Sequence, residues 1–153
     1  MQVADDGESE ERRLAFVDES LDRYPFLTWL GVEVDAAESG RVVLSLPFGE
    51  AVLGSTGEAG EYVHTGVIAT AIDAASEFAL RTLFDDPDAT AVSTTNTNVS
   101  DVRPATDTLS VEVEVVQAGG SVGVTEVSIR EGPPDGGHQE VAIGTVTDRL
   151  FRG

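Results

Sequence analysis

Two kinds of group that support hydrolytic chemistry lie close together in the middle of the chain. His64, Thr65 and Gly66 stand at the start of a run that predicts a helix over residues 65–84, and Asp73 follows His64 by nine residues. The first turn of a helix carries unpaired backbone N–H groups and the positive end of the helix dipole. We therefore expect the N–H groups of Thr65 and Gly66 to stabilise a developing oxyanion. Asp73 supplies a carboxylate, a type of group that can serve as a base or as a nucleophile.

The spacing of these groups predicts an oligomer. Asp73 lies eight residues past Thr65, which is about 12 Å along one helix. One helix cannot bring both groups to the same reacting bond, whereas two antiparallel helices across a two-fold axis can, because such an interface repeats itself. We therefore expect at least a dimer, with the two long helices near the two-fold axis.

The helix over residues 65–84 is the best-patterned element of the sequence. Small and apolar side chains gather on one half of its helical wheel, so we expect the helix to be largely buried. The polar residues that fill the opposite arc are Thr70, Asp73, Ser76, Glu77 and Arg81.

Six strand-like runs flank this helix. Two precede it and four follow it, over residues 32–36, 42–46, 91–103, 108–117, 121–130 and 139–151. The run over 108–117 shows the clearest alternation of apolar and polar residues. Short turns between successive runs, such as the one at residues 118–120, favour antiparallel pairing. The sequence therefore predicts an α+β domain in which one antiparallel sheet wraps around the long helix.

The ends and loops of the chain differ from this core in composition. Residues 1–10 are acidic and poor in apolar side chains, which predicts disorder, and residues 11–153 are expected to form a single domain. A short amphipathic helix is predicted from Ser9 and is expected to end before Pro25. Residues 49–63 are rich in glycine and are predicted to be irregular.

Charge and composition exclude several classes of protein. The 153 residues include 28 acidic and 9 basic side chains, for a net charge of −19. Nucleic acids and anionic membranes both require a basic surface, so neither is an expected partner. No apolar run approaches the length of a membrane span. The chain contains neither cysteine nor lysine, which excludes disulfides, thiolate metal ligands and a P-loop or Schiff-base lysine. We expect no metal and no cofactor.

The acidic excess also indicates a habitat. A domain with this charge repels itself in dilute buffer, whereas at molar salt the Debye length falls to about 3 Å and screens the repulsion. Many acidic residues together with the absence of lysine are typical of a cytoplasmic protein of a halophilic archaeon. An ordinary acidic bacterial protein is the alternative. The first residues lack the basic-then-apolar order of a signal peptide, which agrees with a cytoplasmic location.

The element order and three motifs resemble the hotdog fold of PaaI-type acyl-CoA thioesterases. Residues 62–75 (YVHTGVIATAIDAA) are similar to the family's helix-start motif, in which a His-Gly-Gly is followed by an Asp nine residues after the His. Residues 98–105 (NVSDVRPA) resemble the family's strand that ends in an Arg-Pro-Ala-like turn, and residues 29–34 (WLGVEV) resemble the entry of its first strand. The similarity extends over roughly residues 24–151.

The resemblance implies an acyl-CoA thioesterase that hydrolyses a thioester to the free acid and CoA. It implies a homo-oligomer, a dimer or a tetramer, in which Asp73 of one subunit faces Thr65 of the other. Thr94 stands where relatives carry a Ser or Thr that holds the water or the carboxylate. The residues expected at the catalytic centre are His64, Thr65, Gly66 and Asp73, and those expected to bind substrate are Glu58, Glu77, Thr94 and Arg103.

Two of these positions depart from the family pattern. Thr65 replaces the first Gly after the His, which keeps the N–H and narrows the pocket, and Glu58 stands where relatives have Asn or Gln. Both departures favour an alternative function, a catalytically silent hotdog module that binds acyl-CoA or serves as an oligomeric scaffold. A hotdog dehydratase is a third possibility, but the sequence lacks a hydratase-type His loop.

Each candidate residue also has a structural alternative. His64 caps the helix, positions the substrate loop or, as the weakest option, acts as a general base. In the structural alternative for Asp73, the side chain is an ordinary solvated carboxylate. In the structural alternative for Thr94, the threonine is present for its strand propensity. Glu77 pairs with Arg81 four residues on, and Arg103 pairs with one of the many acidic residues instead of a CoA phosphate.

Overall fold

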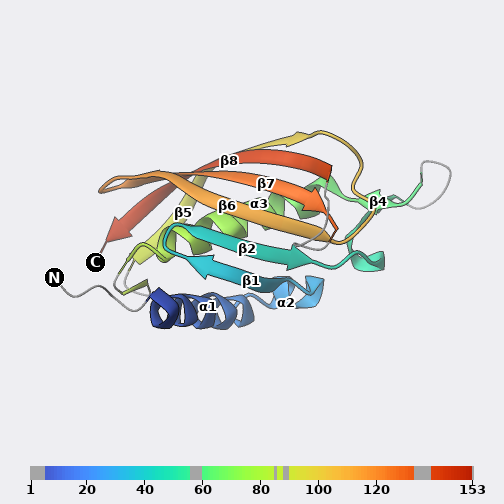
Figure 1. Ribbon diagram of the computed structural model, residues 1–153. Helices are drawn as coiled ribbons and strands as arrows, with labels where there is room; N and C mark the ends of the chain where they lie inside the picture. The colour runs from blue at the N-terminus through green and yellow to red at the C-terminus, as the bar shows by residue number, and fades with distance from the viewer. Residues whose placement is uncertain (1–5, 56–59, 85, 88–89, 133–138, 153) are drawn as a thin grey trace.

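The fold consists of one long helix held in the curve of an antiparallel sheet (Figure 1). The computed structural model describes residues 6–55, 60–84, 86–87, 90–132 and 139–152. The long helix is α3 (Thr65–Arg81), and the sheet has six strands in the order β1-β2-β6-β7-β8-β5. Its strands are β1 (Glu33–Glu38), β2 (Arg41–Leu46), β5 (Thr90–Asp101), β6 (Leu109–Ala118), β7 (Val122–Glu131) and β8 (Gln139–Arg152). The predicted α+β architecture is confirmed, and all six predicted strands are present.

The core lies between α3 and the inner face of the sheet. Leu109, Val111 and Val113 of β6 alternate inward and are fully buried, as the sequence pattern predicts. On the helix side the buried residues include Ile72 and Phe78. The helix lies close to the sheet at Gly144 of β8, where a Cβ atom would come within 2.9 Å of the Ile72 side chain and of the Asn98 carbonyl oxygen. A larger residue at position 144 would therefore push the helix or β5 out of place.

Two helices precede the sheet. The first, α1 (Asp6–Asp22), packs against β1 (Figure 1) and buries Val17 and Leu21. It begins three residues before Ser9, so residues 6–10 are helical, in contrast to the predicted disorder of 1–10. Acidic residues are favourable in the first turn of a helix, which explains why an acidic composition is compatible with helix here. Residues 1–5 lie outside the described part of the chain.

The second helix was not predicted. The sequence analysis treats Pro25 as the end of the first helix, but α2 (Pro25–Leu30) begins at that residue. Proline suits the first position of a helix because its missing N–H would be unpaired there in any case. Gly31 ends α2 with a left-handed φ of 81°, and its N–H donates to the carbonyls of Leu27 and Thr28.

Short elements tie the start of α3 in place. The glycine-rich region, predicted to be irregular, contains a 3-10 turn (Glu50–Val52) and a small sheet of β3 (Leu53–Ser55) and β4 (Tyr62–Val63). The N–H of His64 donates to the Val52 carbonyl, and the N–H of Val63 donates to the Ala105 carbonyl, both at 2.8 Å. These bonds fix the residue before α3 from two sides, which sets the direction in which the helix begins.

The two edges of the main sheet differ. The β1 edge is covered by α1, whereas β5 pairs with β8 on one side and has no strand partner on the other among the described residues. Most of the residues in the second half of α3 are buried, but the helix face next to β5 is half-exposed at Thr70 and Asp73. No helix in the described ranges combines the length and the apolar character needed to cross a membrane.

Candidate active site

The start of α3 is closed by its own capping residue. His64 has extended backbone geometry, and its Nδ1 accepts a hydrogen bond from the Gly66 N–H at 2.8 Å. An imidazole nitrogen that accepts a hydrogen bond carries no proton, so Nδ1 is the unprotonated ring nitrogen in this contact. A Cβ on Gly66 would lie 2.9 Å from that same nitrogen. The glycine is therefore needed for the cap, and the predicted capping role of His64 is observed.

This cap changes which backbone donors are available for an oxyanion. The sequence analysis expects both Thr65 and Gly66 to offer an N–H, but the Gly66 N–H is occupied by His64. Among the described residues, the Thr65 N–H has no acceptor. The Thr65 hydroxyl donates to Asp101 Oδ2 of β5 at 2.8 Å, which orients the first residue of the helix. Thr65 is therefore the donor that the structure leaves open.

A pocket adjoins this helix start. Its volume is about 310 Å³, and Thr65 and Ile68 of α3 contribute one wall. The opposite wall comes from the end of β5 and the turn that follows it, the region of the second sequence motif. The other lining residues are Tyr62, Val63, Asp101, Val102, Arg103, Pro104 and Ala105.

Arg103 at the rim of this pocket is bound to neutral groups. Its Nε donates to the Glu140 backbone carbonyl at 3.1 Å, and its Nη1 donates to Gln139 Oε1 at 2.5 Å. The predicted pairing with an acidic side chain is not seen. The guanidinium is exposed, and neither of these two acceptors compensates its charge, because neither is a carboxylate.

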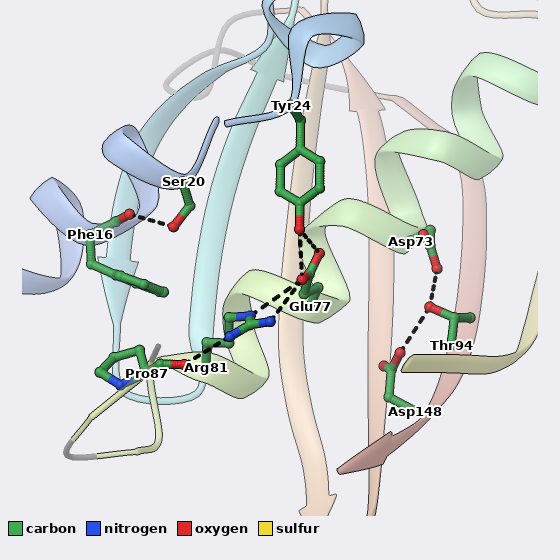
Figure 2. Close-up of polar contacts among 9 residues, drawn as sticks. All are labelled: Phe16, Ser20, Tyr24, Asp73, Glu77, Arg81, Pro87, Thr94 and Asp148. Carbon is green, nitrogen blue, oxygen red and sulfur yellow. Dashed lines mark hydrogen bonds and ion pairs between the residues drawn. The ribbon is translucent and has the colours of Figure 1, made fainter. Parts of the chain in front are cut away.

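Asp73 lies two turns further along α3 and contacts β5. The Thr94 hydroxyl donates a hydrogen bond to Asp73 Oδ1 (Figure 2). Thr94 also pairs in register with Asp148 of β8, directly before a bulge between Thr94 and Asn96. A bulge re-aims the neighbouring side chains, and here Thr94 stands between two carboxylates. The structure thus joins two residues that the sequence analysis places at the site for separate reasons.

Asp148 is the second carboxylate, and it is fully buried. Its Oδ1 lies 3.0 Å from the Thr94 hydroxyl, and its Oδ2 accepts from the Ser76 hydroxyl at 2.6 Å. Ser76 in turn accepts from the Thr125 hydroxyl at 2.7 Å. Burial raises the pKa of the Asp148 carboxyl above its ordinary value of 3.8, hydrogen bonds from Ser76 and Thr94 lower it, and the charge of Asp73 raises it. A buried polar chain therefore runs from β7 through α3 and β8 to Asp73.

The sequence analysis missed the inner part of this chain. It places Ser76 on the polar arc of the helix, yet Ser76 is fully buried because the sheet curves around that side of α3. A signal for Asp148 was present in β8, where Val146, Asp148 and Leu150 occupy alternate positions. Both apolar neighbours point inward and are buried, so the same alternation assigns Asp148 to the inner face.

Glu77 belongs to a different set of contacts. Its carboxylate accepts from the Tyr24 hydroxyl at 2.9 and 3.1 Å and pairs with Arg81 at 3.2 Å (Figure 2). Burial raises the pKa of Tyr24, and the hydrogen bond to Glu77 and its charge raise it further. The predicted pairing of Glu77 with Arg81 is observed, and the substrate contact of Glu77 stays a prediction. Glu58 lies outside the described residues.

The separation of Thr65 and Asp73 in the structure agrees with the separation expected from the sequence. Thr65 and Asp73 lie on one continuous helix, about 12 Å apart along its axis. The part of the chain that the structure describes holds no group of three or more His, Cys, Asp or Glu side chains arranged to bind a metal ion.

Known proteins are similar to this chain in fold and in sequence. Residues 60–137 match the thioesterase superfamily. A Halobacterium salinarum protein, provisionally named an esterase, is 36% identical over 140 residues, which cover 90% of this chain and 92% of that protein. A thioesterase family protein from Silicibacter pomeroyi has a solved structure with 28% identity and a TM-score of 0.77, covering 90% of this chain and 96% of its own. The E. coli PaaI protein, from the phenylacetic acid degradation operon, shares the fold at 16% identity with a TM-score of 0.73, covering 93% of this chain and 96% of its own.

The fold and the site together define a thioester hydrolase with a hotdog fold. The family match spans half of the chain, and the Halobacterium relative is similar over nearly its whole length. The chain belongs to the thioesterase superfamily.

Proposed function

We propose that the protein is an acyl-CoA thioesterase, which hydrolyses an acyl-CoA to the free acid and CoA. The observation that supports this most directly is the Asp73 carboxylate, half-exposed on α3 and oriented by the Thr94 hydroxyl. A carboxylate that is held in place but still reachable by solvent suits a base or a nucleophile. Membership of the thioesterase superfamily favours hydrolysis over a silent binding module.

The proposed mechanism divides the work between the two ends of the site. The Thr65 N–H polarises the thioester carbonyl and binds the oxyanion that develops on it. As a base, Asp73 takes a proton from a water molecule, whose oxygen attacks the carbonyl carbon. The tetrahedral intermediate then collapses, the C–S bond breaks, and the thiolate recovers the proton. As a nucleophile, Asp73 attacks the carbon itself, the C–S bond breaks, and the CoA thiolate leaves. Water then hydrolyses the resulting anhydride, which releases the acid, restores the Asp73 carboxylate and supplies the proton that the thiolate takes up.

Both routes require a second subunit. The separation of Thr65 and Asp73 on one helix is too great for one thioester, so Asp73 of one subunit is proposed to face Thr65 of the other. The outer edge of β5 supports this arrangement, because no strand of the described residues pairs with it and an edge strand of 12 residues is normally covered. Joining two β5 edges antiparallel would also bring the two α3 helices side by side and antiparallel.

The pocket at the helix start is proposed to hold the thioester end of the substrate. The 310 Å³ volume, with Thr65 already forming part of its wall, admits a small or narrow acyl group. Arg103 at the rim is proposed to meet a CoA phosphate, since its guanidinium faces solvent and is bound only to neutral groups. Thr94 is proposed to hold the carboxylate of Asp73.

A panel of acyl-CoA esters, assayed by thiol release in molar KCl, tests this function. We expect at least one ester to be hydrolysed with saturation kinetics. Binding of acyl-CoA without release of thiol from any ester would favour the silent binding module. The structural observation on the side of that alternative is the Gly66 N–H, which is already bonded to His64. Hydrolysis of oxygen esters with no hydrolysis of thioesters would also contradict the proposal.

A further inference from the structure

One hydroxyl group stands between two carboxylates. The Thr94 Oγ1 contacts Asp73 Oδ1 and lies 3.0 Å from Asp148 Oδ1 (Figure 2). A threonine hydroxyl has one hydrogen and so donates to only one of them. The other contact is a hydrogen bond only if that carboxyl group carries a proton and donates to Thr94.

The surroundings of Asp148 favour placing this proton on Asp148. Of its two oxygens, Oδ2 already accepts from Ser76, which leaves Oδ1 as the atom that faces Thr94. Around it β7 contributes Gly123 and Thr125, and β8 contributes Val146 and Leu150, none of which is charged. The one charged group acting on it from the described residues is the Asp73 carboxylate on α3. A fully buried carboxylate without a cation beside it is costly, and taking up a proton relieves that cost.

We propose that Asp148 is a positioning residue for the reaction, protonated on Oδ1 while Asp73 is ionised. Hydrogen bonds then run in one direction, from Asp148 to the Thr94 hydroxyl and from Thr94 to Asp73. The chain continues backward through Ser76, which donates to Asp148 Oδ2, and Thr125, which donates to Ser76. Every hydroxyl in it donates once, and each acceptor is matched. The inference rests on the proposed catalytic role of Asp73.

The arrangement makes the activity sensitive to one buried proton. When Asp148 loses its proton, the single Thr94 hydrogen is contested by two negative carboxylates, and Asp73 loses its orientation. Activity should therefore fall on the alkaline side with the loss of one proton. The raised pKa of Asp148 agrees with a proton held beyond the ordinary carboxyl range.

Carboxyl carbon NMR of protein labelled with ¹³C-aspartate measures this proton without reference to activity. The Asp148 signal is identified by its absence from the Asp148→Asn variant. We expect it to titrate above 3.8, and to titrate at lower pH in Asp73→Asn, because the charge of Asp73 raises the pKa of Asp148. A signal that titrates at or below 3.8, or one that Asp73→Asn leaves unmoved, would overturn the inference.

The pH dependence of kcat gives the second measurement. Asp148→Asn presents an amide donor to Thr94 at every pH, so its alkaline decline should disappear while kcat falls only a few-fold. Asp148→Val offers no donor, and kcat should fall by at least about tenfold, the usual worth of a hydrogen bond in a charged network. Asp35→Asn is the matched control and should keep the wild-type profile. It removes a carboxyl group whose pKa is also raised, on β1 at the opposite edge of the sheet.

The outcomes separate this inference from the proposed function. If the alkaline decline persists in Asp148→Asn, or if Asn and Val at this position are equally impaired, Asp148 has only a structural role. That result would leave the role of Asp73 standing. If instead Asp73→Asn is fully active, the proposed catalytic role of Asp73 fails, whereas the NMR titration still reports on the proton of Asp148. The absence of thiol release from every acyl-CoA ester would be the failure of the proposed function itself.

Discussion

At the scale of single residues, the site depends on a threonine that joins two carboxylates with different surroundings. Asp73 is half-exposed, whereas Asp148 is fully buried. The protein thus holds one carboxylate where solvent reaches it and a second where solvent does not. Environments that separate two titratable groups in this way are a common means of assigning them different protonation states.

The buried carboxyl makes a prediction about stability. The pKa of Asp148 is raised in the folded protein, so the folded state binds its proton more tightly than the unfolded state does. The contribution of Asp148 to stability is therefore complete below pH 3.8, the ordinary pKa of the carboxyl, and is lost as the pH rises through its pKa in the folded protein. Asparagine has no such proton to lose. The free energy of unfolding of Asp148→Asn should therefore increase relative to that of the wild type as the pH rises.

Chemical unfolding of both proteins in the same high-salt buffer, at several pH values, checks this expectation. Asp35→Asn serves as the control for a more exposed carboxyl whose pKa is also raised. A difference between wild type and Asp148→Asn that is constant with pH would show that the pKa of Asp148 is the same in the folded and the unfolded protein, contrary to the expectation.

Residue-scale prediction from sequence succeeded at two positions that the family resemblance marks. The spacing of Asp73 from His64 and the position of Thr94 before its turn led to two side chains that the structure brings into contact. It failed for Ser76, because a helical wheel does not show how far a sheet curves around the helix. It also overlooked Asp148, because the alternation in β8 was used to find a strand and not to ask which polar residue lay inside.

At the scale of elements, the cap of α3 uses a backbone N–H group that could otherwise bind a ligand. The His64 imidazole satisfies the Gly66 N–H, which a helix would otherwise leave for a ligand. The Thr65 N–H remains. The sequence could predict the helix and its first residue, but the rotamer of His64 decides which donor stays open, and no pattern in the chain encodes that rotamer.

Removing the cap should destabilise the protein modestly. His64→Ala deletes the acceptor for the Gly66 N–H, so the free energy of unfolding should fall by about 1 kcal/mol, the typical worth of an N-cap. His64→Asn places a strong capping residue at the same position and should restore most of the loss. Urea unfolding of the three proteins measures the effect.

The same pair of variants tests the other roles considered for His64. If His64 only caps the helix, kcat of His64→Asn should stay close to wild type. Equal and large losses of kcat in His64→Asn and His64→Ala, with stability restored in the first, would instead assign the imidazole a part in the chemistry.

At the scale of the whole molecule, the open β5 edge and the divided site both point to assembly. We expect at least a dimer in solution, with β5 and α3 at its two-fold axis. Sedimentation in high salt should show no folded monomer at micromolar concentration. A folded and active monomer would mean that both ends of the site act within one chain, which the spacing of about 12 Å argues against.

The net charge of −19 predicts a strong dependence on salt. Like charges on one small domain repel one another until ions screen them. Stability and activity should both rise steeply between about 50 mM and about 2 M KCl. Equal stability at the two concentrations, measured by thermal unfolding, would contradict a halophilic origin. The Halobacterium salinarum relative agrees with that origin, which stays a prediction.

The fold as a whole was predictable because its long elements carry strong periodic patterns. The helix over 65–84 and the alternating strand over 108–117 appear in the structure with ends shifted by up to three residues. The short helix α2 was not predictable from the same rules, since a proline both ends and begins helices. How two chains meet requires the contacts of a second copy, and no pattern within one chain supplies them.

The role of Asp73 in the reaction is tested most directly by kcat of Asp73→Asn beside Glu77→Gln. Asparagine keeps the shape of the side chain but can act neither as base nor as nucleophile, so kcat should fall at least about a hundredfold. Glu77→Gln removes the same charge one turn away, where the carboxylate contacts Tyr24 and Arg81 and not the site, and should remain largely active. Both variants should stay oligomeric. Equal activities, or an inactive Glu77→Gln beside an active Asp73→Asn, would contradict the assignment of the chemistry to Asp73.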